Sequence, residues 1–322
     1  MKESKISVNS KAMEIVDRLM GDDLELGVTV KTDGDGATII DAGVEAEGSF
    51  EAGLLITEIC MGGIGKATMG LGEYGGLTLP TVFVETSMPC EALLGSQFAG
   101  WRIEVEDYYA MASGPARALA LKPKKIFEEI RYKDEANEAV VVLESDRLPT
   151  LKALRHIAEK CSVNPDRLYA VVTPTSSIAG SVQISGRIAE TGMHRLVTLG
   201  LNPRLFRHAA GIAPVAPSHP DSKIAMGRTN DVLLYGGETF YIVEADKRDL
   251  ELREIVDKAP SSSSRDYGKP FFEIFKDAGY DFYRIDPALF APAALTLCNL
   301  SDGRVYSAGK VNFEVLKMAM SL

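Results

Sequence analysis

The chain has 322 residues, of which 46% are hydrophobic and 25% are charged, and its formal net charge is -10 at pH 7. A hydrophobic content of this size can bury a substantial core, which predicts a globular protein with one large domain or two ordinary domains. The acidic excess argues against nonspecific binding to nucleic acid or to an anionic membrane, because both require concentrated Lys and Arg.

The cysteines and histidines show no disulfide or metal-site pattern. The cysteines are far apart and lie among apolar residues, at Cys60, Cys90, Cys161 and Cys298. Without a CxxC pair or a His ligand spacing, we expect reduced thiols and no sequence-local metal site.

The N-terminus lacks an apolar signal core, and no apolar run of about eighteen residues occurs. We therefore expect a cytoplasmic protein without a membrane segment.

The first half of the chain alternates helical and extended patterns. We expect a helix over residues 7–20, capped at Asn9 or Ser10. Further along, strands are predicted over residues 26–30, 38–41, 54–60, 81–85, 101–105 and 138–144. The glycine-rich stretch from 61 to 76 is no Walker loop, because Cys60 and Ala67 replace the required Gly and Ser or Thr. It is instead typical of a flexible turn or of a close backbone approach to a ligand.

Residues 113–117 read SGPAR and open a predicted helix with Ser as the cap and Pro in the first turn. The amides at such an end can hold a phosphate or carboxylate, with Arg117 as a counter-charge. A simple cap without a ligand explains the same residues, so both interpretations stay open.

The polar segment 144–150 suggests a boundary between domains at residues 1–145 and 146–322, an approximate division that leaves room for exchanged segments. After it we expect a helix over 151–161, an extended connection over 211–220 and a turn over 226–231. A hairpin is predicted from 232–235 and 239–244, then a helix from Pro270 and a strand near 280–285. The loop at 261–269 is either a linker or, through Arg265, Asp266 and Lys269, a contact to a polar ligand.

The most unusual stretch is VVTPTSSIAGSVQISGRIAETG at residues 171–192, which predicts a short strand followed by a helix that continues to Glu190. One face of this helix is polar but narrow, with small residues beside Arg187 and Glu190. That face fits the wall of a polar pocket. The alternative is an exposed helix on which Arg187 and Glu190 form a weak ion pair.

The sequence has no GxSxG elbow and no GxGxxG fingerprint, so neither a nucleophilic triad nor nicotinamide binding is expected. A carboxylate and a guanidinium one helical turn apart are better suited to acid-base chemistry with water.

Several long motifs in the same order resemble the methenyltetrahydromethanopterin cyclohydrolase family. They are TPTSSIAGSVQISGRIAETG, LGSQFAGW, MASGPARALALKP, MGRTND and RDYGKPFFEIFKDAGYDFYRIDPALFAPA, and the resemblance extends from SVN at residues 7–9 to the C-terminal segment. It implies a mixed α/β (α+β type) fold of two domains with a substrate cleft between them. It also implies a homotrimer without metal or redox cofactor, whose small-molecule partner is the pterin substrate.

The implied reaction is the reversible hydration of the methenyl carbon to an N5-formyl group in one-carbon metabolism. By this resemblance, the catalytic pair of the SGR..E motif falls on Arg187 and Glu190, and our hypothesis is that Glu190 activates water and Arg187 tunes and orients it. The segment that contacts the reacting centre falls on Gln97, Phe98 and Ala99, although the family form has Lys where this chain has Phe98. Further candidates for contacts to the pterin or its tail are Ser113, Gly114, Arg117, Asn230 and Lys269.

Two other functions are compatible with parts of this pattern. A cyclohydrolase for the folate version of the substrate would use the same chemistry, but its motifs are different. A pterin-binding or storage protein without turnover would retain the pocket; the presence of both Arg187 and Glu190 argues against it, and Phe98 is compatible with it.

Overall fold

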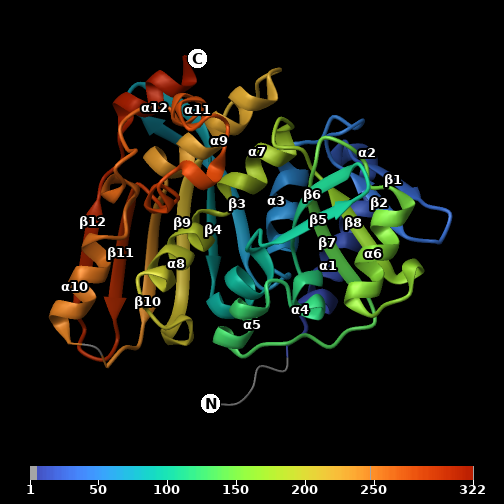
Figure 1. Cartoon of the computed structure of the whole chain (residues 1–322), viewed down its shortest axis with the longest axis horizontal. Coiled ribbons are helices and arrows are strands. Elements are labelled where there is room, and N and C mark those ends of the chain that lie inside the picture. The colour runs from blue at the N-terminus through green and yellow to red at the C-terminus, as the bar shows by residue number, and fades with distance from the viewer. Residues whose placement is uncertain (1–5, 247, 322) are drawn as a thin grey trace. The chain divides into compact units, whose positions relative to one another are not determined.

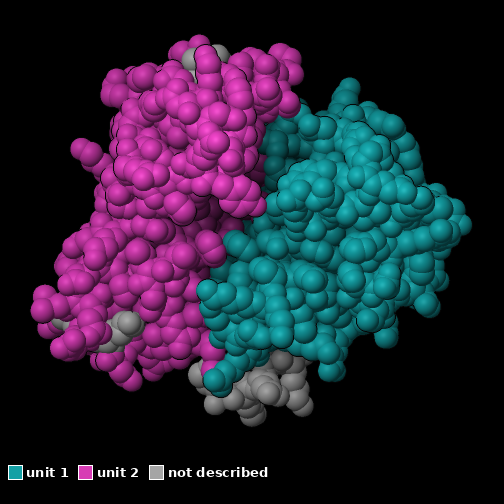
Figure 2. All heavy atoms as spheres, in the orientation of Figure 1, with its two compact units in different colours: residues 1–66, 90–183 teal, residues 67–89, 184–322 magenta. Residues whose placement is uncertain are grey.

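The computed structural model describes residues 6–246 and 248–321, which form two compact units (Figure 2). Unit 1 consists of residues 1–66 and 90–183, and unit 2 consists of residues 67–89 and 184–322. Each unit contains a mixed sheet with helices around it (Figure 1), which confirms the predicted mixed α/β class. The domain boundary at residues 145 and 146 and the substrate cleft stay predictions.

The sheet of unit 1 has the strand order β1-β2-β8-β7-β6-β5, in which β2, β8 and β7 run parallel. In chain order, these strands are β1 Thr29–Thr32, β2 Thr38–Asp41, β5 Trp101–Val105, β6 Tyr108–Ser113, β7 Ala139–Glu144 and β8 Leu168–Val172. Strand β7 is apolar and buried from its first residue to its fifth. Such a run is expected of a parallel strand that is covered on both faces.

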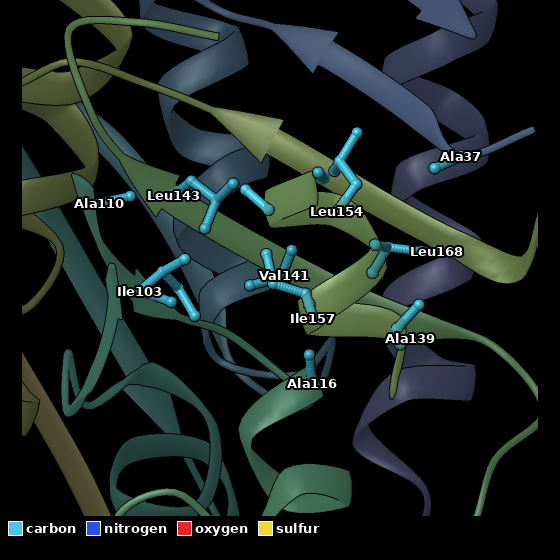
Figure 3. Close-up of a cluster of buried hydrophobic side chains, with 14 of the residues drawn as sticks. Ala37, Ile103, Ala110, Ala116, Ala139, Val141, Leu143, Leu154, Ile157 and Leu168 are labelled. Carbon is cyan, nitrogen blue, oxygen red and sulfur yellow. The ribbon is translucent and has the colours of Figure 1, made fainter. Parts of the chain in front are cut away.

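Two apolar clusters cover the two faces of this sheet. The helices of the unit are α1 Val8–Gly21, α2 Asp23–Leu26, α3 Phe50–Cys60, α4 Ala116–Ala120, α5 Lys124–Ile130, α6 Leu151–Cys161 and α7 Ile178–Ser185, with the π-helix η1 Cys90–Gln97 and the 3-10 turn η2 Pro165–Arg167. On one face, Val141 packs with Leu154 and Ile157 of α6 (Figure 3). On the other, Val140 and Val142 pack with α1 and α3. Helix α7 continues from unit 1 into unit 2.

The sheet of unit 2 has the strand order β12-β11-β10-β9-β4-β3, and within it β10 and β11 run parallel. Its strands are β3 Lys66–Tyr74, β4 Leu77–Thr86, β9 Phe206–Pro214, β10 Glu238–Val243, β11 Ala294–Asn299 and β12 Val305–Gly309. Its helices are α8 Ile188–Thr198, α9 Ser222–Gly236, α10 Asp249–Asp257, α11 Phe271–Asp277 and α12 Phe313–Met320, with the 3-10 turns η3 Pro203–Leu205, η4 Ser261–Ser263, η5 Phe282–Arg284 and η6 Pro287–Leu289.

One face of the unit 2 sheet is covered by helices, and part of the other face is exposed to solvent. Helix α8 packs on β4, β9 and β10, and α10 packs on β11 and β12. On the opposite face, Phe83, Ile212 and Phe240 are 39%, 38% and 43% exposed, and Phe83 pairs in register with Ile212. We call these three residues the open apolar face.

Several predicted elements are wrong because a buried helix lacks a clear hydrophobic periodicity in its sequence. Residues 54–60, predicted as a strand, belong to α3, whose cap Ser49 accepts a hydrogen bond from the Ala52 N–H. Residues 226–231, predicted as a turn, and 232–235, predicted as a strand, both lie in α9. Both helices are buried around most of their circumference, so their apolar residues form a run rather than a stripe.

Other corrections concern strands and caps. Much of the glycine-rich stretch, predicted as a flexible turn, is strand β3, because pairing in the sheet outweighs the low strand propensity of Gly. The connection predicted over 211–220 begins inside β9, and residues 282–284 form a 3-10 turn where a strand was expected. Helix α1 is capped by Ser7, ahead of the predicted caps.

Within the described ranges, no helix is both long and apolar enough to span a membrane.

Candidate active site

The candidate catalytic residues lie where a new helix begins in unit 2. The sequence predicts one helix up to Glu190, but α7 ends at Ser185 and α8 starts at Ile188. Gly186 lies in this break, where its low helix propensity favours a turn. Arg187 is consequently the N-cap residue of α8, and Glu190 is the third residue of the helix.

This position suits a carboxylate. The backbone N–H groups and the dipole of a helix start stabilise negative charge in the first turn, where Glu190 lies. Both candidate side chains are nearly buried, each with 7% exposure. A charge at that depth is tolerated when it is paired and hydrogen-bonded. Arg187 and Glu190 therefore need partners that charged residues on an ordinary surface helix do not need.

The start of α8 is also held close to its sheet. Ile188 lies against Gly211 of β9 and against Gly237, and a Cβ on either glycine would approach the Ile188 side chain to 2.7 Å or 2.2 Å. The Thr191 hydroxyl donates a hydrogen bond of 3.0 Å to the Arg187 carbonyl. Glycine at these two contacts therefore allows the first turn of α8 to pack directly on the sheet.

In unit 1, the predicted contact segment follows a π-helix. Gln97 is the last residue of η1 and is 0% exposed, while Phe98 and Ala99 are partly exposed. The Phe98 N–H donates to the Leu93 carbonyl at 2.8 Å, and the Ser96 hydroxyl donates to the Cys60 carbonyl at 2.6 Å. The π-helical conformation is rare and is frequently found at functional sites.

Ser113 and Gly114 lie beside this π-helix at the end of β6. The Gly114 N–H donates to the Ser96 carbonyl at 2.9 Å, and Gly114 has φ +90°, which favours glycine. The predicted Ser cap is wrong, because α4 starts at Ala116 with Pro115 as its N-cap and without a side-chain cap bond. Ser113 is instead the last residue of β6, and this position places it next to η1.

Arg117 of α4 is fully buried, and its hydrogen bonds connect α4 with the π-helix η1. Its Nη1 donates to the carbonyls of Leu94 and Ser96 at 3.1 and 3.0 Å, and its Nε donates to the Lys122 carbonyl at 2.8 Å. These bonds bring the guanidinium to the end of the π-helix. Its role as a counter-charge for a ligand stays a prediction, while its contacts within unit 1 are those of a structural anchor.

Two aromatic rings flank the same guanidinium. The Arg117 Cζ lies 5.3 Å from the centre of the Phe98 ring and 5.5 Å from that of Phe127. Arginine stacks favourably on aromatic faces. The Phe98 side chain therefore contributes to the anchoring of η1.

The remaining candidates lie in another part of unit 2. Asn230 is in α9 and donates from Nδ2 to the Met226 carbonyl at 2.9 Å. Lys269 forms an ion pair with Asp277, which raises the pKa of the Lys269 ammonium. The Tyr235 hydroxyl of α9 donates to the Lys269 carbonyl at 2.7 Å, so the structure links the loop of Lys269 to the helix of Asn230.

Sequence reasoning missed Asp231, which is almost completely buried. Its Oδ1 accepts a 2.8 Å hydrogen bond from the N–H of Phe271, the first residue of α11. Burial raises the pKa of Asp231 to about 8. Residues 226–231 were predicted as a turn, so the sequence pattern gave no indication that this carboxyl is buried.

Comparison with known proteins identifies the family. The profile of the cyclohydrolase (MCH) family matches residues 7–320. The chain therefore belongs to the MCH cyclohydrolase family. This finding confirms the resemblance seen in the sequence motifs.

Curated relatives of the MCH cyclohydrolase family match over almost their full length. The methenyltetrahydromethanopterin cyclohydrolase of Methanocaldococcus jannaschii is 46% identical over 318 residues, with 98% of both chains covered. The protein of that name from Methanococcus maripaludis strain C7 is 47% identical over 320 residues, also with 98% of both covered. The one from Methanococcoides burtonii is 45% identical over 311 residues, with 97% of both covered.

Proposed function

We propose that this chain catalyses the reversible hydration of 5,10-methenyl-tetrahydromethanopterin to the N5-formyl form in the cytoplasm, without a metal or redox cofactor. Its membership of the MCH cyclohydrolase family and the names of its relatives support the substrate and the reaction. The observation that carries the chemistry is the nearly buried Glu190 in the first turn of α8, three residues after Arg187.

In the proposed mechanism, Glu190 is the general base. The methenyl carbon is part of a cationic N–C–N group and is already electrophilic, so the enzyme needs to position and deprotonate one water. A C–O bond forms as Glu190 takes a proton from that water. The resulting carbinolamine collapses: one C–N bond breaks, the leaving nitrogen takes a proton from Glu190, and the hydroxyl proton passes to solvent. The formyl group stays on N5, and the net reaction releases one proton.

Arg187 has two proposed roles. Its positive charge favours the ionised form of a nearby carboxylate, which opposes the effect of desolvation on Glu190. Its N–H groups are also suited to hydrogen-bond the oxygen on which negative charge develops during collapse. We further propose that Gln97, with the backbone at Phe98 and Ala99, contacts the substrate, and that Ser113, Gly114, Arg117, Asn230 and Lys269 contribute to binding.

The function is tested by the near-ultraviolet absorbance of methenyl-tetrahydromethanopterin after addition of the purified protein. We expect a rapid fall in absorbance with this substrate and a much slower one with the folate analogue. Equal rates with both would favour the folate cyclohydrolase. Tight binding without an absorbance change would favour a carrier or storage protein.

We also propose that the protein is a homotrimer whose subunits associate through the open apolar face. Large apolar side chains that line up across an uncovered sheet are typical of a protein interface. The register of Phe83 with Ile212 places two of them side by side, and Phe240 stands on the next strand, β10.

Phe240→Glu is therefore expected to dissociate the trimer without unfolding the subunit, because Phe240 is 43% exposed within one chain. Sedimentation analysis should change from three times the chain mass of 34.8 kDa to that mass alone. Leu24→Glu, at a residue of α2 that is 93% exposed, is the control and should leave the mass unchanged. A Phe240→Glu protein that stays trimeric would place the interface elsewhere.

A further inference from the structure

Tyr241 of β10 lies directly beneath the helix turn that carries the candidate catalytic residues. Its side chain is completely buried, and its hydroxyl donates a 2.7 Å hydrogen bond to the carbonyl of Ala189. Ala189 is the residue immediately before Glu190. This buried hydrogen bond connects the sheet of unit 2 to the backbone next to the proposed general base.

The hydroxyl has the protonation state that this bond requires. Burial raises the pKa of Tyr241 well above its ordinary value, and the negative charge of Glu190 acts in the same direction. Tyr241 consequently stays protonated at the pH values at which the protein would work, and its O–H remains a donor to the Ala189 carbonyl.

The helix is close enough for this bond because glycines line its contact with the sheet. A Cβ on Gly192 of α8 would lie 2.3 Å from the Tyr241 hydroxyl oxygen. A Cβ on Gly211 of β9 would lie 3.1 Å from the Ala189 nitrogen. Both distances are below ordinary van der Waals contact, so a side chain at either glycine would force the first turn of α8 away from β10.

We propose that Tyr241 is a positioning residue that fixes the first turn of α8 and thereby aims the Glu190 carboxylate at the reacting water. This inference rests on the proposed function. A general base works only within hydrogen-bond reach of the proton that it removes. Because a hydrogen bond is directional, a tether on the adjacent peptide restrains the backbone from which the Glu190 side chain projects.

The first test compares Tyr241→Phe with Tyr74→Phe. Tyr74 is also a buried tyrosine of unit 2, and its hydroxyl lies 3.2 Å from that of Thr81, in the β3–β4 pair. Both variants lose a buried, hydrogen-bonded tyrosine hydroxyl, so we expect similar shifts of their urea unfolding midpoints. Tyr241→Phe alone should lower kcat by about tenfold, with KM within about twofold, since a displacement of about 1 Å can cost up to about 10²-fold.

The second test uses the contact between Gly192 and Tyr241. Gly192→Ala alone should lower kcat because its Cβ meets the tyrosine oxygen. In the Tyr241→Phe background that oxygen is missing, and the nearest remaining atoms are Thr239 Oγ1 at 3.1 Å and the ring Cζ at 3.2 Å. The double variant should therefore turn over about as fast as Tyr241→Phe, so that the two effects are far from multiplicative.

The outcomes separate this inference from the proposed function. Turnover by the unmodified protein, with the expected loss in Tyr241→Phe and a non-multiplicative double variant, supports the positioning role. A kcat of Tyr241→Phe equal to that of Tyr74→Phe, or two effects that multiply, would overturn it and leave the proposed function intact. An unmodified protein that binds the substrate without turnover would overturn both.

Discussion

Replacing Glu190 with Gln is expected to remove most of the turnover, with kcat reduced about 10²- to 10⁴-fold, which is the usual contribution of a general base. Glutamine has nearly the same shape and can still accept hydrogen bonds from the start of α8, but it cannot take a proton from water. KM should change little, because the substitution affects a proton transfer in the transition state rather than substrate binding. The measurement is steady-state hydration followed by absorbance.

Glu254→Gln is the matched control, since Glu254 is an exposed glutamate of α10 in the same unit. Its kcat should equal that of the unmodified protein. Arg187→Lys should also be slow, because an ammonium cannot reproduce the planar guanidinium fork. A Glu190→Gln protein with near-normal kcat would refute the assignment of Glu190 as the base and point to another proton acceptor.

Replacing Arg117 with Met is expected to cause the largest loss of stability, about 3–5 kcal/mol, because the guanidinium donates three hydrogen bonds and a hydrogen bond to a charged group contributes about 1.5–3 kcal/mol. The carbonyls of Leu94, Ser96 and Lys122 would lose the donors that Arg117 supplies. Unsatisfied buried carbonyls are costly, and methionine fills the space without supplying any N–H. Urea unfolding followed by circular dichroism measures the change in free energy.

Arg102→Met is the matched control. Arg102 also lies over an aromatic ring, that of Tyr109 at 5.5 Å, but its side chain is 58% exposed and pairs with Glu104 on the surface. Exposed pairs of this kind contribute about 1 kcal/mol or less, so this variant should stay close to the original stability. If Arg117→Met were no less stable than Arg102→Met, the anchoring of the π-helix by Arg117 would be wrong.

The sequence by itself was sufficient to predict the features that depend on the local pattern of apolar and polar residues. The apolar run of β7 and the amphipathic helix at residues 151–161 were predicted within about one residue of their observed bounds, because a short run of β-branched residues indicates a buried strand and a single apolar stripe indicates a helix. The long motifs, in their order along the chain, were enough to indicate the family. Arg187 and Glu190 were selected because a narrow polar stripe among small residues is unusual on a helix.

Only the tertiary structure decided features that depend on residues far apart in the sequence. The break at Gly186 makes Arg187 an N-cap and places Glu190 in a first turn, and its position depends on the packing of α8 against β9 and β10. The buried state of Arg117 depends on carbonyls about twenty residues earlier in the chain, which no local pattern indicates. Tyr241 reaches the peptide before Glu190 across 52 residues of sequence. The local sequence thus determined most of the secondary structure and the choice of candidate residues. Long-range hydrogen bonds and close packing at glycines determined the positions and the contacts of those residues.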